Sequence, residues 1–98
     1  MTFARRTNVQ MPEANAHEDR AIADAILRLL ASRAPSSSIC PSDVARALSS
    51  DERIWRAQMP TIRRVAAQLA KEGRVKVTRG AMQVNALSKG GPIRIRRA

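Results

Sequence analysis

The sequence predicts a small α+β domain with three main helices followed by a short β-hairpin or three-stranded sheet. Apolar residues recur at helical spacing through the first two thirds of the chain. Charged and apolar residues alternate in the last third, as they do in half-buried strands. The length of 98 residues suits one domain with a modest core. We therefore expect an N-terminal arm, residues 1–16, and one folded domain, residues 17–98.

The N-terminal arm shows neither helical nor strand periodicity, so we expect it to be flexible, with Arg5 and Arg6 able to contact phosphates. A helical pattern begins near His17 and ends near Arg33. Acidic residues near its start and Arg33 near its end suit the helix dipole. This helix serves mainly the core, through an apolar face of Ile22, Ile26, Leu29 and Leu30.

A second helix is predicted over residues 41–48, after a turn-forming cluster and a very short strand at Ile39. Pro41 fits its first turn, and Asp43 complements the helix start. Cys40 lies just before this start, where a thiol can become reactive. We favour a small half-buried capping residue over a nucleophile or redox sensor, because the sequence offers no histidine–acid pair to activate the thiol.

A short helical turn follows, with Ile54 and Trp55. We interpret Trp55 as the plug of a small core rather than as a base-stacking side chain. Pro60 allows either one helix kinked at that residue or two helices, the second starting near Met59. We favour two helices, because proline fits the first turn of a helix and is unfavourable in its interior.

The helix from Met59 to Glu72 has two different faces. Its apolar stripe has the spacing i, i+3, i+4, i+7 and consists of Ile62, Val65, Ala66 and Leu69. Arg63, Arg64 and Lys71 lie on the other side, with Arg56 in line before the helix. Gly73 fits the residue just past the helix end. One face can therefore pack against the core while the other binds a ligand.

Three short strands are predicted after this helix, over residues 74–78, 82–84 and 92–96. The first two form a hairpin around Arg79 and Gly80, and the third places Ile93 and Ile95 inward. A basic amphipathic helix followed directly by a basic hairpin is the local arrangement of a winged helix-turn-helix domain. We therefore expect this fold.

The net charge of +10 is concentrated in the second half of the chain. Residues 1–50 hold six arginines against five acidic residues, a balance of +1, whereas residues 51–98 hold twelve Lys and Arg against three, a balance of +9. Such a block attracts polyanions, nucleic acid first. A coding bias toward arginine would raise the charge without segregating it.

Our leading hypothesis is binding to double-stranded DNA, with the helix from Met59 to Glu72 in the major groove, as in a transcriptional regulator. Arg63 and Arg64 are candidates for contacts to base edges or phosphates, and Thr61 and Gln68 for hydrogen bonds. The predicted phosphate contacts, which set affinity without reading sequence, are Arg56, Lys71, Lys76, Arg79, Arg94 and Arg96.

The alternative is a protein interaction module whose basic face docks an acidic protein or whose hairpin edge pairs with another copy. RNA binding is a variant of the first hypothesis, disfavoured because only one Phe and one Trp occur. We expect no enzyme, cofactor or metal site, since no catalytic pair or ligand cluster is visible. No apolar run spans a bilayer and no signal peptide is evident, so we expect a cytoplasmic protein of undetermined oligomeric state.

Four segments resemble a family of small, uncharacterised bacterial proteins, a domain of unknown function with a winged-helix-like fold. The resemblance covers about residues 18–97 and implies the fold, but no activity or site residue. The segments are Ile39 to Leu48, the pair Trp55-Arg56 with Met59-Pro60, the helix exit Ala70 to Arg74, and Gly91 to Arg94.

Overall fold

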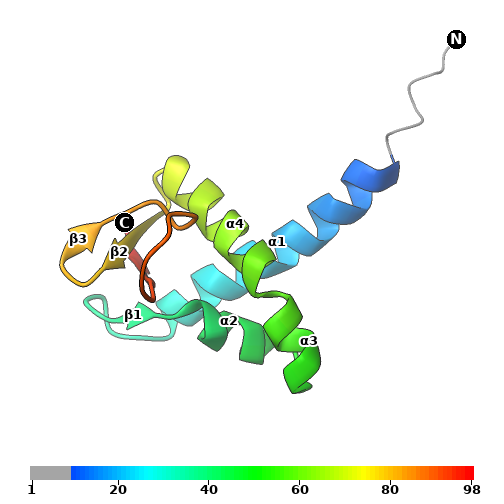
Figure 1. Cartoon of the computed structure of the whole chain (residues 1–98), viewed down its shortest axis with the longest axis horizontal. Helices are drawn as coiled ribbons and strands as arrows, with labels where there is room; N and C mark the ends of the chain where they lie inside the picture. The colour runs from blue at the N-terminus through cyan, green and yellow to red at the C-terminus, as the bar shows by residue number, and fades with distance from the viewer. Residues whose placement is uncertain (1–9) are drawn as a thin grey trace, which may run out of the picture.

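The computed structural model describes residues 10–98 of the chain, with side chains from residue 16 onward. The helices are α1 (Gln10–Ala31), α2 (Pro41–Leu48), α3 (Glu52–Ala57) and α4 (Met59–Lys71). The strands are β1 (Ser38–Ile39), β2 (Val75–Arg79), β3 (Met82–Gln83) and β4 (Arg94–Arg97). The predicted α+β class is confirmed. Figure 1 shows the sheet at one end of the molecule and the first half of α1 projecting from the other.

Helix α1 begins at Gln10 and not near His17, so the helical chain starts well inside the predicted arm. Pro12 suits the first turn of a helix, and Glu13, Ala14 and Ala16 favour helical structure. The apolar stripe was absent from these residues because this part of α1 extends beyond the rest of the domain (Figure 1), where there is no core to face. The suggested phosphate contacts of Arg5 and Arg6 lie outside the described residues.

The middle of the chain follows the prediction closely. Helix α2 covers Pro41–Leu48, the predicted range, with Cys40 as its N-cap residue. The chain forms two helices here and not one kinked helix, because α3 ends at Ala57 and α4 begins at Met59. Pro60 lies in the first turn of α4. The side chain of Asp51 caps α3 by accepting hydrogen bonds from the backbone N–H groups of residues 53 and 54.

The sheet is antiparallel, with strand order β1-β4-β2-β3. It has four strands because the short segment at Ile39 pairs with β4. Strand β4 spans Arg94–Arg97 and thus starts two residues later than predicted, after Pro92, which lacks the N–H that a paired strand needs. Strand β2 therefore lies between β3 and β4 and pairs with both.

The core lies between the helices and one face of the sheet. Ile39, Ile95 and Val77 are paired across three adjacent strands, and each is at most 1% exposed. The predicted stripe of α4 is fully buried against them and against α1 and α2, and it consists of Ile62, Val65, Ala66 and Leu69. Trp55 is half-buried and packs against this core, as predicted.

Candidate nucleic-acid interface

The face of the sheet turned away from the core carries the cations predicted for β2 and β4. The register places Lys76 directly opposite Arg96, and Thr78 opposite Arg94. Like charges on directly opposed residues destabilise a sheet. The register therefore places two positive charges side by side on this outer face.

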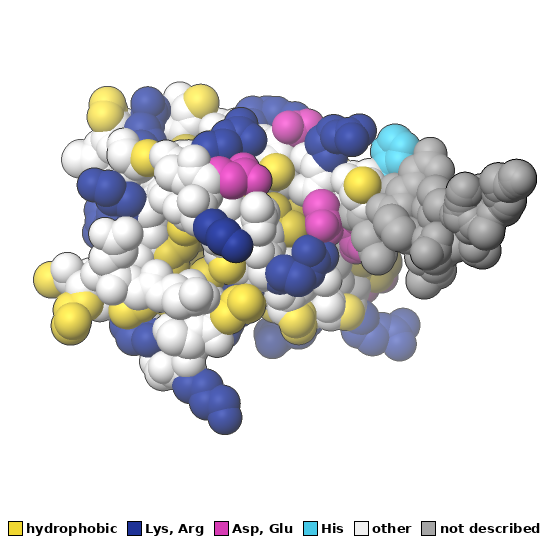
Figure 2. All heavy atoms as spheres, turned by 90° about the horizontal axis from the view of Figure 1, so that it is seen from above, with side chains coloured by type: hydrophobic (Ala, Val, Ile, Leu, Met, Phe, Trp, Pro, Cys, Tyr) yellow, Lys and Arg dark blue, Asp and Glu magenta, His cyan; other side chains and the backbone are white. Residues whose placement is uncertain are grey.

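Among the described residues, no Asp or Glu side chain pairs with a cation of this surface. From Gly73 to the C-terminus the chain holds seven Lys and Arg residues and no Asp or Glu. Among the described residues, the ion pairs involve Arg33, Arg46, Arg56 and Arg64, all outside that segment. In Figure 2 the acidic side chains lie toward the middle and the α1 end, while the charged side chains visible at the sheet end, at the left, are Lys and Arg.

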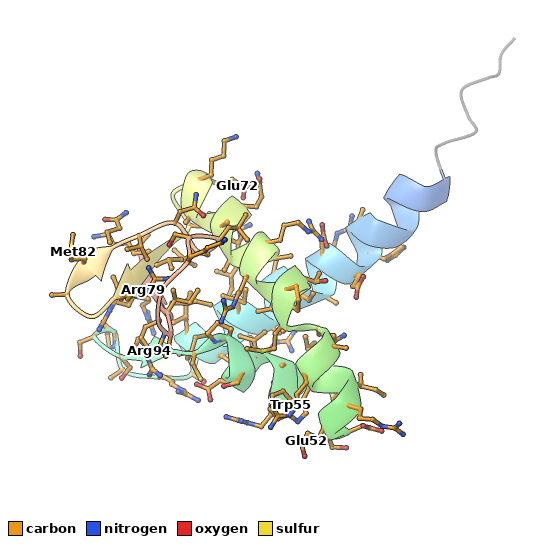
Figure 3. All side chains as sticks on the ribbon, in the orientation of Figure 1. Glu52, Trp55, Glu72, Arg79, Met82 and Arg94 are labelled. Carbon is orange, nitrogen blue, oxygen red and sulfur yellow. The ribbon has the colours of Figure 1, made fainter. Side chains whose placement is uncertain are left out.

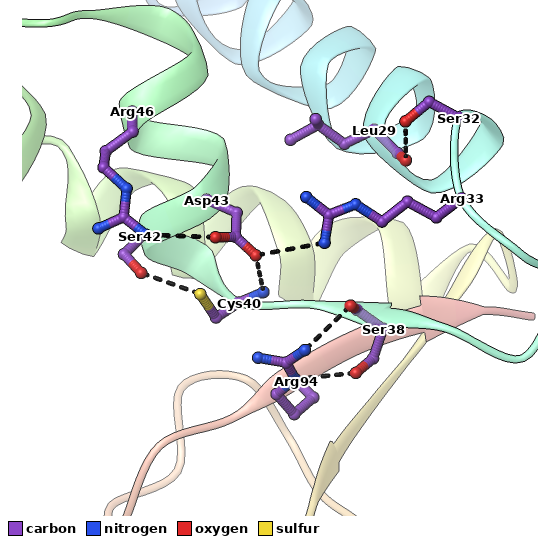
Figure 4. A network of polar contacts seen from close by, with 9 residues as sticks. All are labelled: Leu29, Ser32, Arg33, Ser38, Cys40, Ser42, Asp43, Arg46 and Arg94. Carbon is purple, nitrogen blue, oxygen red and sulfur yellow. Dashed lines mark hydrogen bonds and ion pairs between the residues drawn. The ribbon is translucent and has the colours of Figure 1, made fainter.

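Arg94 and Arg96 are held in place by neutral acceptors. The Arg94 guanidinium donates to Ser38 Oγ at 2.8 Å and to the Ser38 carbonyl oxygen at 3.0 Å (Figure 4). The Arg96 guanidinium donates to Thr78 Oγ1 at 3.3 Å and to the Ser36 carbonyl oxygen at 3.2 Å. None of these acceptors carries a full charge, so the hydrogen bonds fix the positions of both guanidinium groups without an ion pair to a carboxylate.

Arg79 points back into the connection between β3 and β4 (Figure 3). Its guanidinium donates to the carbonyl oxygens of Gly91 at 3.0 Å and Ser88 at 3.1 Å. Gly90 allows this close approach, since a Cβ atom at that position would lie 2.7 Å from Arg79 Cζ. Arg79 therefore organises the loop, and its charge adds to the same end of the molecule.

Arg64 pairs with α1. Its guanidinium donates to both carboxylate oxygens of Asp19, at 3.0 and 2.7 Å. This hydrogen bonding lowers the pKa of Asp19 and raises that of Arg64, against a smaller opposing effect of burial. The predicted contact of Arg64 with nucleic acid would have to compete with this bidentate pair.

Arg63 lies on the other flank of α4, beside the turn at residues 85–87. It lines a groove with Met59, Pro60, Ala86 and Leu87. Its Nε atom is buried and has no hydrogen-bond partner among the described residues. The adjacent arginines, predicted as one basic face, therefore have different surroundings.

The remaining predicted contacts on the helices are spread over several surfaces. Thr61 is half-buried beside Glu18 and α3, and Gln68 donates to Glu72 Oε2 at 3.0 Å along α4. Arg56 pairs with Glu52 at 2.7 Å on α3, away from the sheet. Lys71 is exposed at the end of α4 and lies next to the basic segment, unlike Arg56 on α3.

The start of α2 forms a compact polar network (Figure 4). The Cys40 backbone N–H donates to Asp43 Oδ2 at 3.1 Å, and the half-buried thiol lies 2.9 Å from Ser42 Oγ. Burial raises the pKa of Asp43, but the hydrogen bond from Cys40 and the charges of Arg33 and Arg46 outweigh it and lower the pKa overall. Cys40 therefore occupies the predicted capping position.

Three further cations belong to the basic end but were not singled out from the sequence. Arg74 and Lys89 are exposed, and the absence of acidic residues after Gly73 could have identified both. Arg97 donates to the carbonyl oxygens of Leu30 at 3.0 Å and Arg33 at 2.9 Å. No local pattern indicates that contact, because its partners lie more than 60 residues away.

The described residues lack two further kinds of feature. Residues 10–98 contain no group of three or more His, Cys, Asp or Glu side chains that could hold a metal ion. None of the helices in that range has the length and apolar character needed to cross a membrane.

The comparisons with known proteins identify a family. No curated protein matches the sequence. The model of a family described as "Protein of unknown function (DUF3253)" matches residues 19–98, which include α2 to α4, all four strands and most of α1. The chain belongs to this family of proteins of unknown function, DUF3253.

Proposed function

We propose that this protein is a winged-helix nucleic-acid-binding protein that binds double-stranded DNA, as a transcriptional regulator does. One observation carries the proposal: the outer face of the sheet and its connecting loop hold a cluster of cations with no acidic residue in the same segment. The proposal includes a cytoplasmic location, which depends on the sequence arguments above, and a bacterial origin, which depends on the family resemblance alone.

The geometry of the outer sheet face suits a phosphate backbone. Phosphate contacts require positive charges in fixed positions, and the hydrogen bonds to Ser36, Ser38 and Thr78 fix two of them. Lys76 stands beside Arg96 in the adjacent strand and is exposed. Lys71 and Arg74 extend the positive surface from the sheet to the end of α4.

Helix α4 would supply base contacts through its N-terminal half, the part of a recognition helix that reaches base edges. Arg63 is the favoured residue, since Arg64 is engaged by Asp19. The fold order supports this view, because α2, α3 and α4 are followed directly by the basic strands.

The test is a titration of duplex binding between about 50 and 200 mM salt, in which affinity should fall steeply. The variant Lys76→Gln/Lys89→Gln removes two exposed cations from the basic end, and its salt slope should be shallower by about 2. The matched control, Arg20→Gln/Arg28→Gln, removes two exposed cations from α1 and should change the slope much less. Absence of duplex binding at low salt, or equal effects of both variants, would contradict the proposal.

A second candidate is an interaction module, and an exposed edge of the sheet favours it. Strand β3 lies at this edge, and its Met82 is 70% exposed and points away from the domain (Figure 3). An unpaired edge with an apolar side chain can pair with another chain. A pull-down from nuclease-treated lysate, with light scattering on the purified protein, tests it: loss of all partners on nuclease treatment and a monomeric mass would exclude this function.

A further inference from the structure

Arg63 differs from the other arginines of the candidate interface. Arg64 is bound to a carboxylate, whereas Arg79, Arg94 and Arg96 donate to neutral oxygens of the chain. Among the described residues, Arg63 has neither kind of partner, and its Nε atom is buried without an acceptor. Unsatisfied buried donors are rare in folded proteins because they lose hydration without gaining a hydrogen bond. Of these five arginines, Arg63 is therefore the one whose guanidinium group is not engaged by another described residue.

The surroundings of Arg63 are apolar. Its groove is formed by Met59 and Pro60 in the first turn of α4 and by Ala86 and Leu87 in the facing turn. Ala86 is buried, which anchors that turn against the domain, while Leu87 is 59% exposed. The groove therefore combines one free guanidinium with an exposed apolar wall.

The turn that carries Leu87 is braced by local hydrogen bonds. The Leu87 backbone N–H donates to Asn85 Oδ1 at 2.8 Å, and Ser88 Oγ donates to the Asn85 carbonyl oxygen at 2.7 Å. Arg79 also holds the Ser88 carbonyl from β2. The apolar wall is thus presented in a defined position, as a site for specific recognition requires.

We propose that this groove reads a guanine next to a thymine in the major groove of duplex DNA, an inference that depends on the proposed function. A guanidinium matches the O6 and N7 acceptors of guanine, and an apolar side chain matches the thymine methyl group. The groove lies at the N-terminal end of α4, where recognition helices contact bases. Charge complementarity supports this occupant, since the groove adjoins the segment without acidic residues.

The experiment uses a duplex of about 20 base pairs with repeated TG steps, and two copies of it that differ in single chemical groups. In one copy, deoxyuridine replaces every thymidine, which removes the methyl groups. In the other, 7-deazaguanine replaces every guanine, which removes the N7 acceptor. The phosphates are identical in all three, so sequence-independent electrostatic binding cancels in the comparison.

The full-length protein should bind the uracil duplex about fourfold more weakly for each buried methyl group. It should bind the 7-deazaguanine duplex about tenfold more weakly. Arg63→Lys keeps the charge but loses the rigid fork of donors, so it should become less sensitive to 7-deazaguanine than the unchanged protein and stay equally sensitive to uracil. Leu87→Ser, a change of an exposed side chain, should show the reverse pattern. Arg28→Lys, on α1, is the matched control and should behave as the unchanged protein.

The outcomes separate the inference from the proposed function. Equal affinity for all three duplexes would overturn the inference and leave duplex binding intact. Loss of both sensitivities in Arg63→Lys and in Leu87→Ser would also overturn it, because the two groups would then not act separately. Absence of binding to every duplex at low salt would overturn the inference together with the proposed function.

Discussion

Arg64 on α4 and Asp19 on α1 form a bidentate ion pair between residues 45 positions apart in the sequence. The core contacts of α1 start at Ile22, so the pair extends the contact between these helices by about one turn. Arg64, which the sequence places on the outward side of α4, therefore has a structural role in joining α4 to α1. Its value to folding can be measured separately from any role in binding.

The first prediction concerns this pair. Because the Arg64 and Asp19 side chains are 53% and 32% exposed, a double-mutant cycle of Asp19→Asn and Arg64→Gln should give a coupling free energy of about 0.2–1 kcal/mol. Urea unfolding of the two single variants and the double variant measures it. A coupling of zero would mean that α1 and α4 are held together by their apolar contacts alone.

The second prediction concerns acid sensitivity. The folded state lowers the pKa of Asp19 and Asp43, so the unfolded state binds more protons as the pH falls. The stability that these carboxylates contribute is present above their unfolded pKa, about 4, and is lost as the pH drops through the lowered folded values. Unfolding measured at a series of pH values should show this loss below about pH 4–5. Asp43→Asn should flatten the curve, because it removes one of these two carboxylates.

Local signals explain what the sequence predicted correctly. The range of α2 follows from Pro41 and Asp43 at its start and from the serines after Leu48. The division of α3 from α4 follows from Pro60. In β2 and β4 charged and apolar residues alternate along the strand, and this alternation predicted which side chains face the core.

Non-local contacts explain what the sequence did not predict. The helical wheel places Arg63 and Arg64 on one side of α4, but α1 occupies one flank and the turn at residues 85–87 the other. The segments that cover the two flanks are distant from α4 in the sequence, so the helical periodicity of α4 does not indicate them. The strand order has the same origin, since β1 meets β4 across more than 50 residues.

The third prediction concerns the loop between β3 and β4. Gly90 has a φ of 142°, which L side chains rarely adopt, and a Cβ atom there would meet the Arg79 guanidinium. Gly90→Ala should therefore lower the free energy of unfolding by about 1–3 kcal/mol. Gly91→Ala is a matched control, because a Cβ atom at that position meets no atom within 4 Å, and it should be close to neutral. Equal stabilities of the two variants would show that the contact with Arg79 does not constrain the loop.

The fourth prediction separates a structural cation from a solvated one at the basic end. A single nitrogen of Arg97, Nη2, donates to the carbonyl oxygen of Leu30 in the last turn of α1 and to that of Arg33 just past the helix end. Arg97→Gln should therefore destabilise the fold by about 1–2 kcal/mol, since hydrogen bonds from charged donors contribute more than neutral ones. Lys89→Gln removes the same charge from an exposed loop position and should change stability by less than about 0.5 kcal/mol. Thermal and urea unfolding of both variants measure the difference, and equal losses would show that net charge, not the link to α1, determines the effect of Arg97.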